Sequence, residues 1–232
     1  MRIERAEFGQ DYGNYRFGYT EHAALEDGEP LEDAYEAGFL PASSDPSVTD
    51  RFYMARSVRV PLASWTPSSE NRRILKKFDG EFVSHIRTRE ELLSSAAFKS
   101  CFLGYFSGKH GERVMSPERL DGILATHLPL RGVEYEKDGA LIAYALEIET
   151  PTFIHYWYSA YDLSYNDRSL GMWLLLDSVR RAKDAGCAYS YLGTAYGTKG
   201  RYKMNLSPLP FWDGSSWVQN DALLKERIQN DS

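Results

Sequence analysis

Cysteine is almost absent from this sequence of 232 residues, which contains only Cys101 and Cys187. Two cysteines so far apart provide neither the disulfide framework of a small secreted domain nor the paired spacing of a zinc site. Each lies in an apolar segment, and free cysteine is among the most frequently buried residue types. We therefore expect two packed thiols, no cysteine nucleophile and no bound metal.

Long hydrophobic runs are also missing. No apolar stretch approaches the roughly 20 residues that a membrane-spanning helix needs, and the first residues, MRIERAEFGQ, lack the apolar core of a secretory signal. There is no internal repeat and no low-complexity tract. These absences predict a globular cytoplasmic protein without a membrane partner, built as one large domain or two small fused ones.

Positive charge is scarce at the start of the chain. Residues 1–50 hold 12 Asp and Glu against three Arg, a net charge of −9. The remaining residues hold 21 acidic and 24 basic side chains, a net charge of +3, although the whole chain carries −6. Because the chain after residue 50 is mildly basic, the acidic net charge of the whole chain does not exclude nucleic-acid binding. Aromatic residues, at 14% with 16 Tyr, are abundant and typical of amphipathic pockets.

The first half of the chain shows few strong periodic signals. Residues 1–50 are polar and run into LPASSDPSVTD, which is typical of a loop. RFYMARSVRVPL predicts a strand that ends at Pro61. Ser68 or Ser69 is expected to cap a helix over TPSSENRRILKKF. Residues 89–106 and 116–127 are predicted as further helices, the second beginning at Ser116-Pro117.

From Val133 the apolar period becomes two. GVEYEKDGALIAYALEIET predicts a hairpin that turns at Asp138-Gly139, and TFIHYWYSAYD predicts an interior strand. A helix follows and closes at Gly186, before a last buried strand, CAYSYLGTAY. This order predicts an α+β fold of the acyltransferase type with a mixed sheet. We divide the chain into an acidic N-terminal region (1–60), a helical and basic segment (61–130) and a transferase core (131–232).

The turn NDRSLGMW, before that helix, has two interpretations. Ser169-Leu170-Gly171 could be a plain helix start in which Gly171 permits close packing. Alternatively, the first-turn N–H groups, which have no partner inside the helix, could bind an anionic ligand beside Arg168. In the acetyltransferase-type (GNAT) fold a glycine-containing turn at this position cradles phosphates. The coenzyme A version is usually longer, Arg/Gln-x-x-Gly-x-Gly/Ala, and only one glycine is present here.

Several segments in order resemble the arginyl-tRNA–protein transferase family, including its bacterial leucyl-transferring branch. The family's Ser-Leu-Gly turn, Tyr-x-Tyr-Leu-Gly strand end, Lys-Met-x-Tyr-Lys segment and following Pro match residues 169–171, 189–193, 199–203 and Pro208. Its Arg-Val and Pro-Ser-x-x-x-Arg-Arg segments match residues 59–60 and 67–73. The resemblance runs from about Leu31 to Trp217. Two departures are that Gly200 replaces the family's Met and that no cysteine cluster precedes the Arg-Val segment.

The resemblance implies a GNAT-like fold and the transfer of an amino acid, Arg or Leu, from charged tRNA to the N-terminal amine of an acceptor protein or peptide. The acceptor would begin with an acidic residue and would be tagged for degradation. Partners would be aminoacyl-tRNA and the acceptor, and we expect no cofactor because the cysteine cluster is missing. Two alternatives stay open: an acyl-coenzyme A-dependent N-acyltransferase, and a non-catalytic tRNA- or degron-binding relative.

Candidate site residues follow from residue type within this resemblance. Asp162 or Asp167 could orient or deprotonate the attacking amine, although Asp also closes turns. Tyr191 and Tyr202 could stabilise developing negative charge, although they could also be hydrogen-bonded tyrosines that pack in the core. His155 is more typical of a core histidine. We expect substrate binding by Arg72, Arg73, Tyr156, Tyr158, Arg168, Ser169, Leu170, Gly171, Lys199, Arg201 and Lys203.

Overall fold

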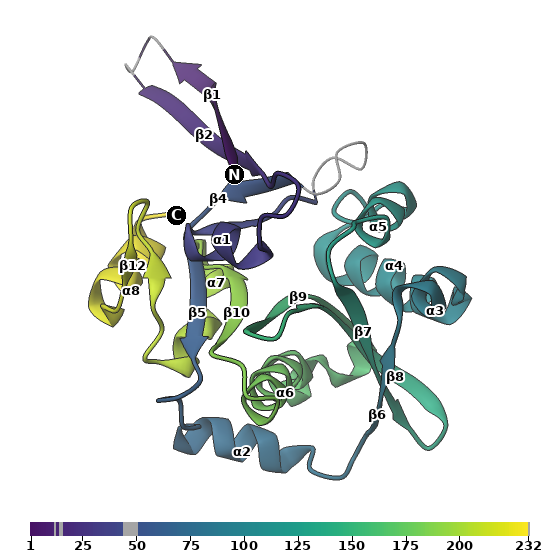
Figure 1. Cartoon of the computed structure of the whole chain (residues 1–232). Coiled ribbons are helices and arrows are strands. Elements are labelled where there is room, and N and C mark those ends of the chain that lie inside the picture. The colour runs from purple at the N-terminus through teal and green to yellow at the C-terminus, as the bar shows by residue number, and fades with distance from the viewer. Residues whose placement is uncertain (12, 14–15, 44–50, 232) are drawn as a thin grey trace.

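The computed structural model describes residues 1–11, 13, 16–43 and 51–231 and contains two sheets (Figure 1). The larger sheet is formed by β5 (Ser57–Pro61), β6 (Val83–Arg87), β7 (Leu130–Lys137), β8 (Ala140–Glu149), β9 (Phe153–Tyr161), β10 (Tyr189–Thr194), β11 (Phe211–Trp212) and β12 (Trp217–Val218). Its strand order is β12-β11-β5-β10-β9-β8-β7-β6. Only the β9–β10 pair is parallel. The predicted mixed, mostly antiparallel sheet is confirmed.

The smaller sheet comes from the N-terminal region. Its strands are β1 (Arg2–Asp11), β2 (Arg16–Ala24), β3 (Phe39–Pro41) and β4 (Arg51–Met54), in the order β1-β2-β4-β3. The hairpin of β1 and β2 projects from the rest of the molecule (Figure 1). No strand was predicted in residues 1–50, and the loop expected at LPASSDPSVTD begins within β3; residues 44–50 of that loop lie outside the described residues. No apolar alternation marked β1, because its described side chains are solvent-exposed.

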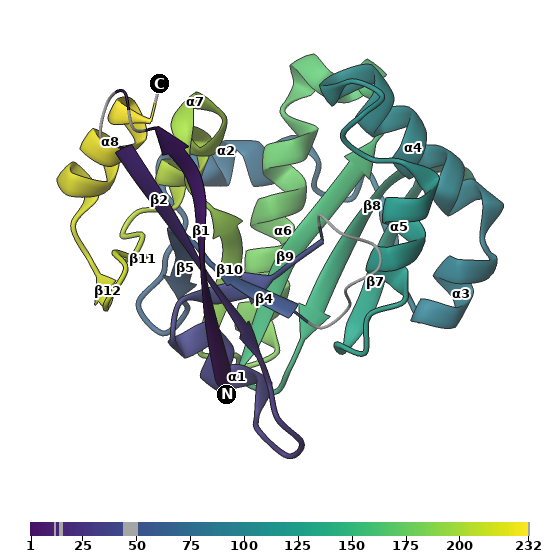
Figure 2. The same cartoon turned by 90° about the horizontal axis from the view of Figure 1, so that it is seen from above.

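Helices cover both faces of the larger sheet (Figure 2). One face holds α2 (Ser69–Lys77), α6 (Leu170–Asp184) and α8 (Asp221–Asn230), which pack on Val58, Val133 and Ile154. The other face holds α1 (Leu31–Glu36), α3 (Arg89–Ser94), α4 (Ala96–His110), α5 (Pro117–Leu124) and strands of the smaller sheet. Short helical turns η1 (Leu163–Arg168), α7 (Gly197–Gly200) and η2 (Arg201–Leu206) lie between the major elements. No helix of the described chain is long and apolar enough to cross a membrane.

Local signals predicted most helix and turn boundaries correctly. Ser68 accepts a hydrogen bond from the Asn71 N–H at the start of α2, and Ser116 caps α5 in the same way. Asp138 and Gly139 have positive φ at the hairpin turn, and Gly186 has φ +77° just past α6.

Three boundaries differ from the sequence prediction. The predicted strand over residues 51–62 is two strands, β4 and β5, which lie in different sheets. The predicted helix over residues 89–106 is divided at Ser95, whose side chain caps α4 by accepting from the Phe98 N–H. Residues 83–87, for which no element was predicted, form the edge strand β6, where most side chains remain solvent-accessible. Tertiary strand pairing decided the first and third of these boundaries, whereas the local cap at Ser95 decided the second.

A buried carboxylate fixes α6 to the sheet. Glu147 on β8 is fully buried and accepts hydrogen bonds from Arg181 and Ser178 of α6 and from Arg131 of β7, at distances of 2.6–3.2 Å. Burial alone would raise the pKa of Glu147, but the two guanidinium groups hold it below its usual value. The charge is therefore fully paired, and three elements meet at one side chain.

Substitution of Glu147 tests this clamp. Glu147→Ala leaves Arg181 and Arg131 partly buried without their shared anion and should lower the free energy of unfolding by about 3–5 kcal/mol at neutral pH. The matched variant Glu149→Ala removes a carboxylate that is 38% exposed and also pairs with Arg131, and should cost less than about 1 kcal/mol. Because the folded pKa of Glu147 is lowered, its contribution is present near neutral pH and is lost on acidification. Equal effects of the two variants in urea unfolding would contradict the clamp.

Candidate functional site

The parallel strands β9 and β10 separate after the first three residues of β9. They pair only from Phe153 to His155 on β9 and from Tyr189 to Tyr191 on β10. Beyond this point β9 stays with β8 through to Tyr161, and β10 stays with β5. A β-bulge at Trp157 shifts the register with β8 and changes which face the following residues occupy. A cavity of about 790 Å³ opens where the strands have parted.

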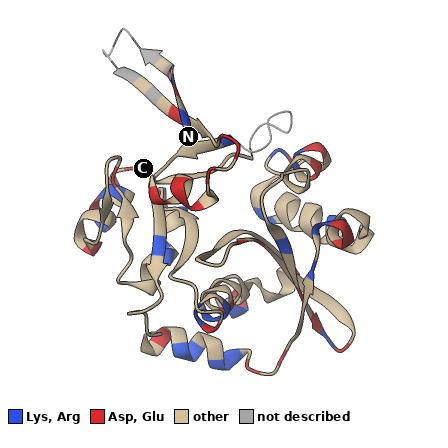
Figure 3. Ribbon diagram, viewed as in Figure 1, with Lys and Arg blue, Asp and Glu red and all other residues tan. Residues whose placement is uncertain are grey.

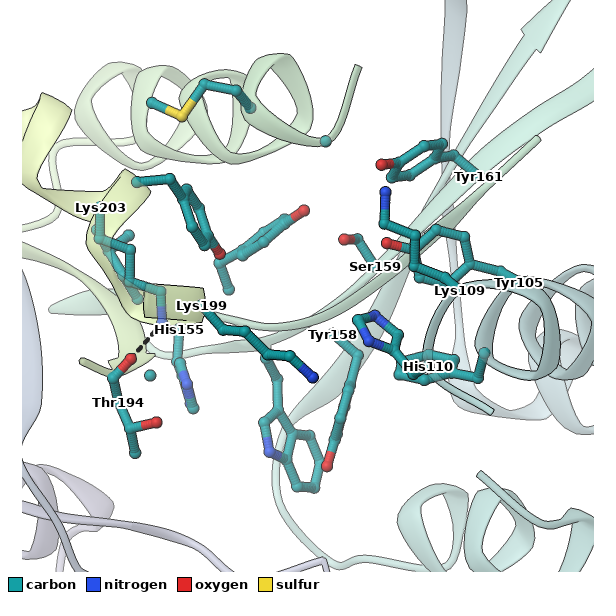
Figure 4. Close-up of a pocket in the computed structure, with 18 of the residues that line it drawn as sticks. Tyr105, Lys109, His110, His155, Tyr158, Ser159, Tyr161, Thr194, Lys199 and Lys203 are labelled. Carbon is teal, nitrogen blue, oxygen red and sulfur yellow. Dashed lines mark hydrogen bonds between the residues drawn. The ribbon is translucent and has the colours of Figure 1, made fainter. Parts of the chain in front are cut away.

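Five parts of the chain line this cavity (Figure 4). They are β3 and its neighbourhood (Leu40, Pro41, Ser43, Tyr53), the end of α4 (Tyr105, Phe106, Lys109, His110), β9 (residues 155–159 and Tyr161), the start of α6 with η1 (Asn166, Ser169, Gly171, Met172), and β10 with α7 and η2 (Leu192, Gly193, Thr194, Lys199, Tyr202, Lys203). Among the described residues, three lysines, two histidines and no Asp or Glu line it. The cavity is cationic in a chain whose net charge is −6.

Lys203 lies at the closed end of the cavity. The residue is 9% exposed, and its Nζ donates to the Thr194 carbonyl at 2.5 Å. Burial lowers the pKa of Lys203 from 10.5 to about 8. No carboxylate of the described chain pairs with it. Near neutral pH the cavity therefore holds a buried ammonium group without a counter-ion.

His155 is the last residue of β9 that pairs with β10, and it lies beside Lys203. Its Nδ1 hydrogen-bonds to the hydroxyl of Tyr35 from α1 at 2.8 Å, while Nε2 is buried at the cavity wall without a partner among the described residues. Burial, reinforced by Lys203, lowers the pKa of His155 to about 3, so the ring is neutral near pH 7. The sequence indicated a core histidine; the ring is indeed buried, but one nitrogen also faces the cavity.

Lysines and a histidine also gather at the cavity mouth. Lys109 and His110 end α4, and Lys199 on α7 approaches them from the opposite side (Figure 4). Lys109 donates to the Asn166 side chain. Partial burial lowers the pKa of His110, and the neighbouring Lys199 and Lys109 lower it further. These three side chains are exposed and can meet an incoming anion.

The start of α6 shows features of both sequence interpretations. Ser169 has φ +67°, and its carbonyl accepts from the N–H groups of Met172 and Trp173, both at 3.1 Å. The N–H groups of Leu170 and Gly171 have no acceptor among the described residues. A Cβ on Gly171 would lie 3.2 Å from the Tyr161 ring, so glycine also permits close packing. Ser169 and Gly171 line the cavity.

The structure brings seven of the predicted site residues together at the cavity. They are Tyr156, Tyr158, Ser169, Gly171, Lys199, Tyr202 and Lys203. Their functional roles remain predictions. Sequence reasoning did not select Tyr105, Lys109 or His110. The predicted helix ended at residue 106, whereas α4 continues to His110, and only the fold brings its last turn to the cavity.

The other predicted residues lie outside the cavity. Asp162 caps η1 by accepting from the Ser164 N–H, and Asp167 is solvent-exposed. Tyr191 is buried and bonds to Arg59 at 2.9 Å. Nothing in these contacts places a carboxylate near the unpaired cations.

The remaining predicted binding residues also lie outside the cavity. Arg168 forms an ion pair with Glu81, and Leu170 is fully buried in the core. Arg72 and Arg73 lie on the exposed face of α2, and Arg201 lines a separate small hollow with Lys225. In Figure 3 the blue segments along α2 mark its Lys and Arg residues.

Comparisons with known proteins agree with the resemblance seen in the sequence. A family model described as "Arginine-tRNA-protein transferase, C terminus" matches residues 82–213. An aspartate/glutamate leucyltransferase of Afipia carboxidovorans is 30% identical over 72% of this chain and 69% of its own length. The corresponding protein of Xanthobacter autotrophicus is 31% identical over 64% of each chain. The crystal structure of FemX aligns with a TM-score of 0.50 at 10% identity, over 82% of this chain and 66% of that chain, which supports the GNAT-like fold.

Because Lys203 is unpaired, we expect the free energy of unfolding to increase when its charge is removed. The unfolded chain, with a lysine pKa near 10.5, binds more protons than the folded chain between pH 8 and 10.5, so stability rises with pH over that window. Below pH 8 the burial of the ammonium group costs roughly 3 kcal/mol at most. Lys203→Met should therefore be more stable than the original chain at pH 7 by about 1–3 kcal/mol, with a smaller difference at pH 10.

Denaturant unfolding at pH 7 and pH 10 measures this difference. Lys99→Met is the control, because Lys99 is exposed and pairs with Asp121. A loss of stability in Lys203→Met at pH 7 would show that the ammonium group is a structural anchor.

Proposed function

Because this chain belongs to the arginine-tRNA-protein transferase family, we propose that it transfers an amino acid from an aminoacyl-tRNA to the N-terminal amine of a protein that begins with Asp or Glu. The observation that supports this most directly is the cavity between β9 and β10, which is cationic and contains no described carboxylate. Its volume of about 790 Å³ suits a ligand site that holds an aminoacyl ester and an N-terminal residue together.

The reaction needs few groups from the protein. The neutral α-amine attacks the ester carbonyl, a C–N bond forms, the C–O bond to the ribose breaks, and the proton lost by the amine ends on the ribose hydroxyl. Nearby cations disfavour a charged ammonium and so lower the pKa of an α-amine, which is ordinarily about 8. The same cations stabilise the oxyanion of the tetrahedral intermediate. Asp162 and Asp167 lie outside the cavity, so this scheme uses positioning and cations without a carboxylate base.

Leucine fits the cavity better than arginine as the transferred residue. Among the described lining residues there is no Asp or Glu that could pair with a guanidinium group, and Lys109, Lys199 and Lys203 would repel it. An uncharged leucine side chain can instead pack on aromatic walls such as Tyr156 and Tyr105. The names of the curated relatives, which are leucyltransferases, support the same choice.

The basic face of α2 provides a path for the tRNA backbone. Arg72, Arg73, Lys76 and Lys77 are exposed along the helix. At its end, Lys77 donates to the Arg168 carbonyl at 2.6 Å, and the next residue, Ser169, lines the cavity. The ridge of positive charge therefore reaches the edge of the site at the start of α6.

A transfer assay tests the proposed activity. The protein, leucyl-tRNA and a peptide beginning with Asp or Glu should yield a peptide longer by one residue, detected by mass spectrometry. Uncharged tRNA should give no product, and the omission of acetyl-coenzyme A should have no effect. Product only with acetyl-coenzyme A would assign the chain to the N-acyltransferases instead. Binding of tRNA and peptide without any product would identify a non-catalytic relative.

Neutralisation of the α2 ridge should weaken tRNA binding through the lost phosphate contacts. The double variant Arg72→Gln/Lys76→Gln should lower affinity for all tRNAs alike and reduce the slope of log K against log salt by about 1–2. Lys99→Gln, on the other side of the molecule, is the matched control. An unchanged salt slope, measured by fluorescence titration between about 50 and 200 mM salt, would exclude α2 from the tRNA path.

A further inference from the structure

Two hydrogen-bond donors converge at the closed end of the cavity. A Cβ built on Gly193 would lie 3.7 Å from Lys203 Nζ and 3.9 Å from His155 Nε2, so both atoms face the same open side of this glycine. Gly193 has φ +78°, and its missing side chain leaves that side free. The strands β9 and β10 begin to separate two residues earlier on β10. The result is a small recess with polar walls at the apex of the cavity.

Hydrogen-bond accounting fixes the proton of His155. The Tyr35 hydroxyl is fully buried, and His155 Nδ1 is its one partner among the described residues. If Nδ1 carried the proton, the hydroxyl hydrogen of Tyr35 would be buried without an acceptor. Donation from Tyr35 to Nδ1 satisfies both groups and leaves the proton of the neutral ring on Nε2. His155 therefore directs an N–H toward the cavity, where it meets no acceptor among the described residues.

We propose that His155 Nε2–H and Lys203 Nζ form the subsite that binds the side-chain carboxylate of the acceptor's first residue and so select Asp or Glu. The inference rests on the proposed function, because it assigns the acceptor's acidic side chain to one part of that site. Tyr35 is a positioning residue, since it acts on the substrate only through the tautomer of His155.

Charge balance favours a bound carboxylate over other occupants. Lys203 is buried and lacks a counter-ion in the described chain, and such a charge is strongly destabilising until it is paired. A carboxylate supplies one negative charge and two acceptor oxygens, which match one ammonium and one imidazole N–H. The oxyanion of the tetrahedral intermediate has the same chemistry but exists only during the reaction. The tests below separate these two sources.

Peptide binding measured by calorimetry tests the subsite without any need for turnover. The unmodified chain should bind a peptide beginning with Asp at least tenfold more tightly than the same peptide beginning with Asn, because charged hydrogen bonds discriminate by such factors. Lys203→Met should bring the two affinities within about threefold of each other. Lys99→Met should keep the original preference. Equal binding of both peptides by the unmodified chain would overturn the subsite.

A matched pair of substitutions tests the His155 donor. His155→Gln places an amide N–H2 near the position of Nε2 and should retain most of the preference for Asp. His155→Asn places its amide near Nδ1, within reach of Tyr35 but short of the recess, and should lose about tenfold of that preference. Tyr35→Phe should reduce the preference for the Asp peptide by about three- to tenfold and leave binding of the Asn peptide unchanged. Equal losses for both peptides in all three variants would indicate a purely structural role.

Kinetics separate the carboxylate from the reaction oxyanion. If Lys203→Met reduces kcat equally for Asp and Asn acceptors while peptide affinities remain unchanged, the two donors serve the oxyanion and the carboxylate assignment is wrong. If the chain transfers no amino acid yet still prefers the Asp peptide, the subsite stands and the proposed activity fails. Each result therefore identifies which of the two proposals it contradicts.

Discussion

The separation of β9 from β10 is the constraint on which the rest of the site depends. Each strand keeps its outer neighbour, β8 or β5, so the two inner edges cannot pair beyond His155 and Tyr191. The edges could not remain in an apolar core, because unpaired backbone groups need polar partners. A polar, open cavity resolves this conflict. The Glu147 clamp helps to maintain it, since it fixes α6 to β7 and β8 while the start of α6 forms one wall.

The distribution of charge follows from the same arrangement. Carboxylates near the sheet are engaged by cations: Glu147 by Arg181, Glu134 by Arg87, and Glu81 by Lys137. The cavity has the opposite character, because three lysines and no carboxylate are among its described lining residues. Such an arrangement costs stability in the empty protein, and it is the expected signature of a site that an anionic substrate completes. The overall acidity of the chain conceals this, since net charge reports nothing about where the cations gather.

Sequence patterns predicted those parts of the fold that depend on local chemistry. Ser68 and Ser116 cap helices, and Asp138-Gly139 turns a hairpin, because each signal acts within a few residues. Long-range strand pairing was harder to predict from the sequence. β6 has mostly solvent-accessible side chains, and the break between β4 and β5 arises because the two strands join different sheets. For the site, family motifs led to Lys199 and Lys203, whereas Lys109 and His110 required the fold, which places the end of α4 opposite α7.

His155 illustrates why burial and function are not alternatives at this site. Its position between apolar neighbours correctly indicated a buried ring, and the ring is satisfied on one side by Tyr35. The other nitrogen reaches the cavity only because the β9–β10 pair ends at this residue.

The acidic N-terminal region therefore contributes to the site in two ways: Tyr35 from α1 orients His155, and Leu40 and Tyr53 complete the cavity wall. A change in the packing of α1 would alter the hydrogen bond to Nδ1 and, through the ring, the donor that faces the substrate.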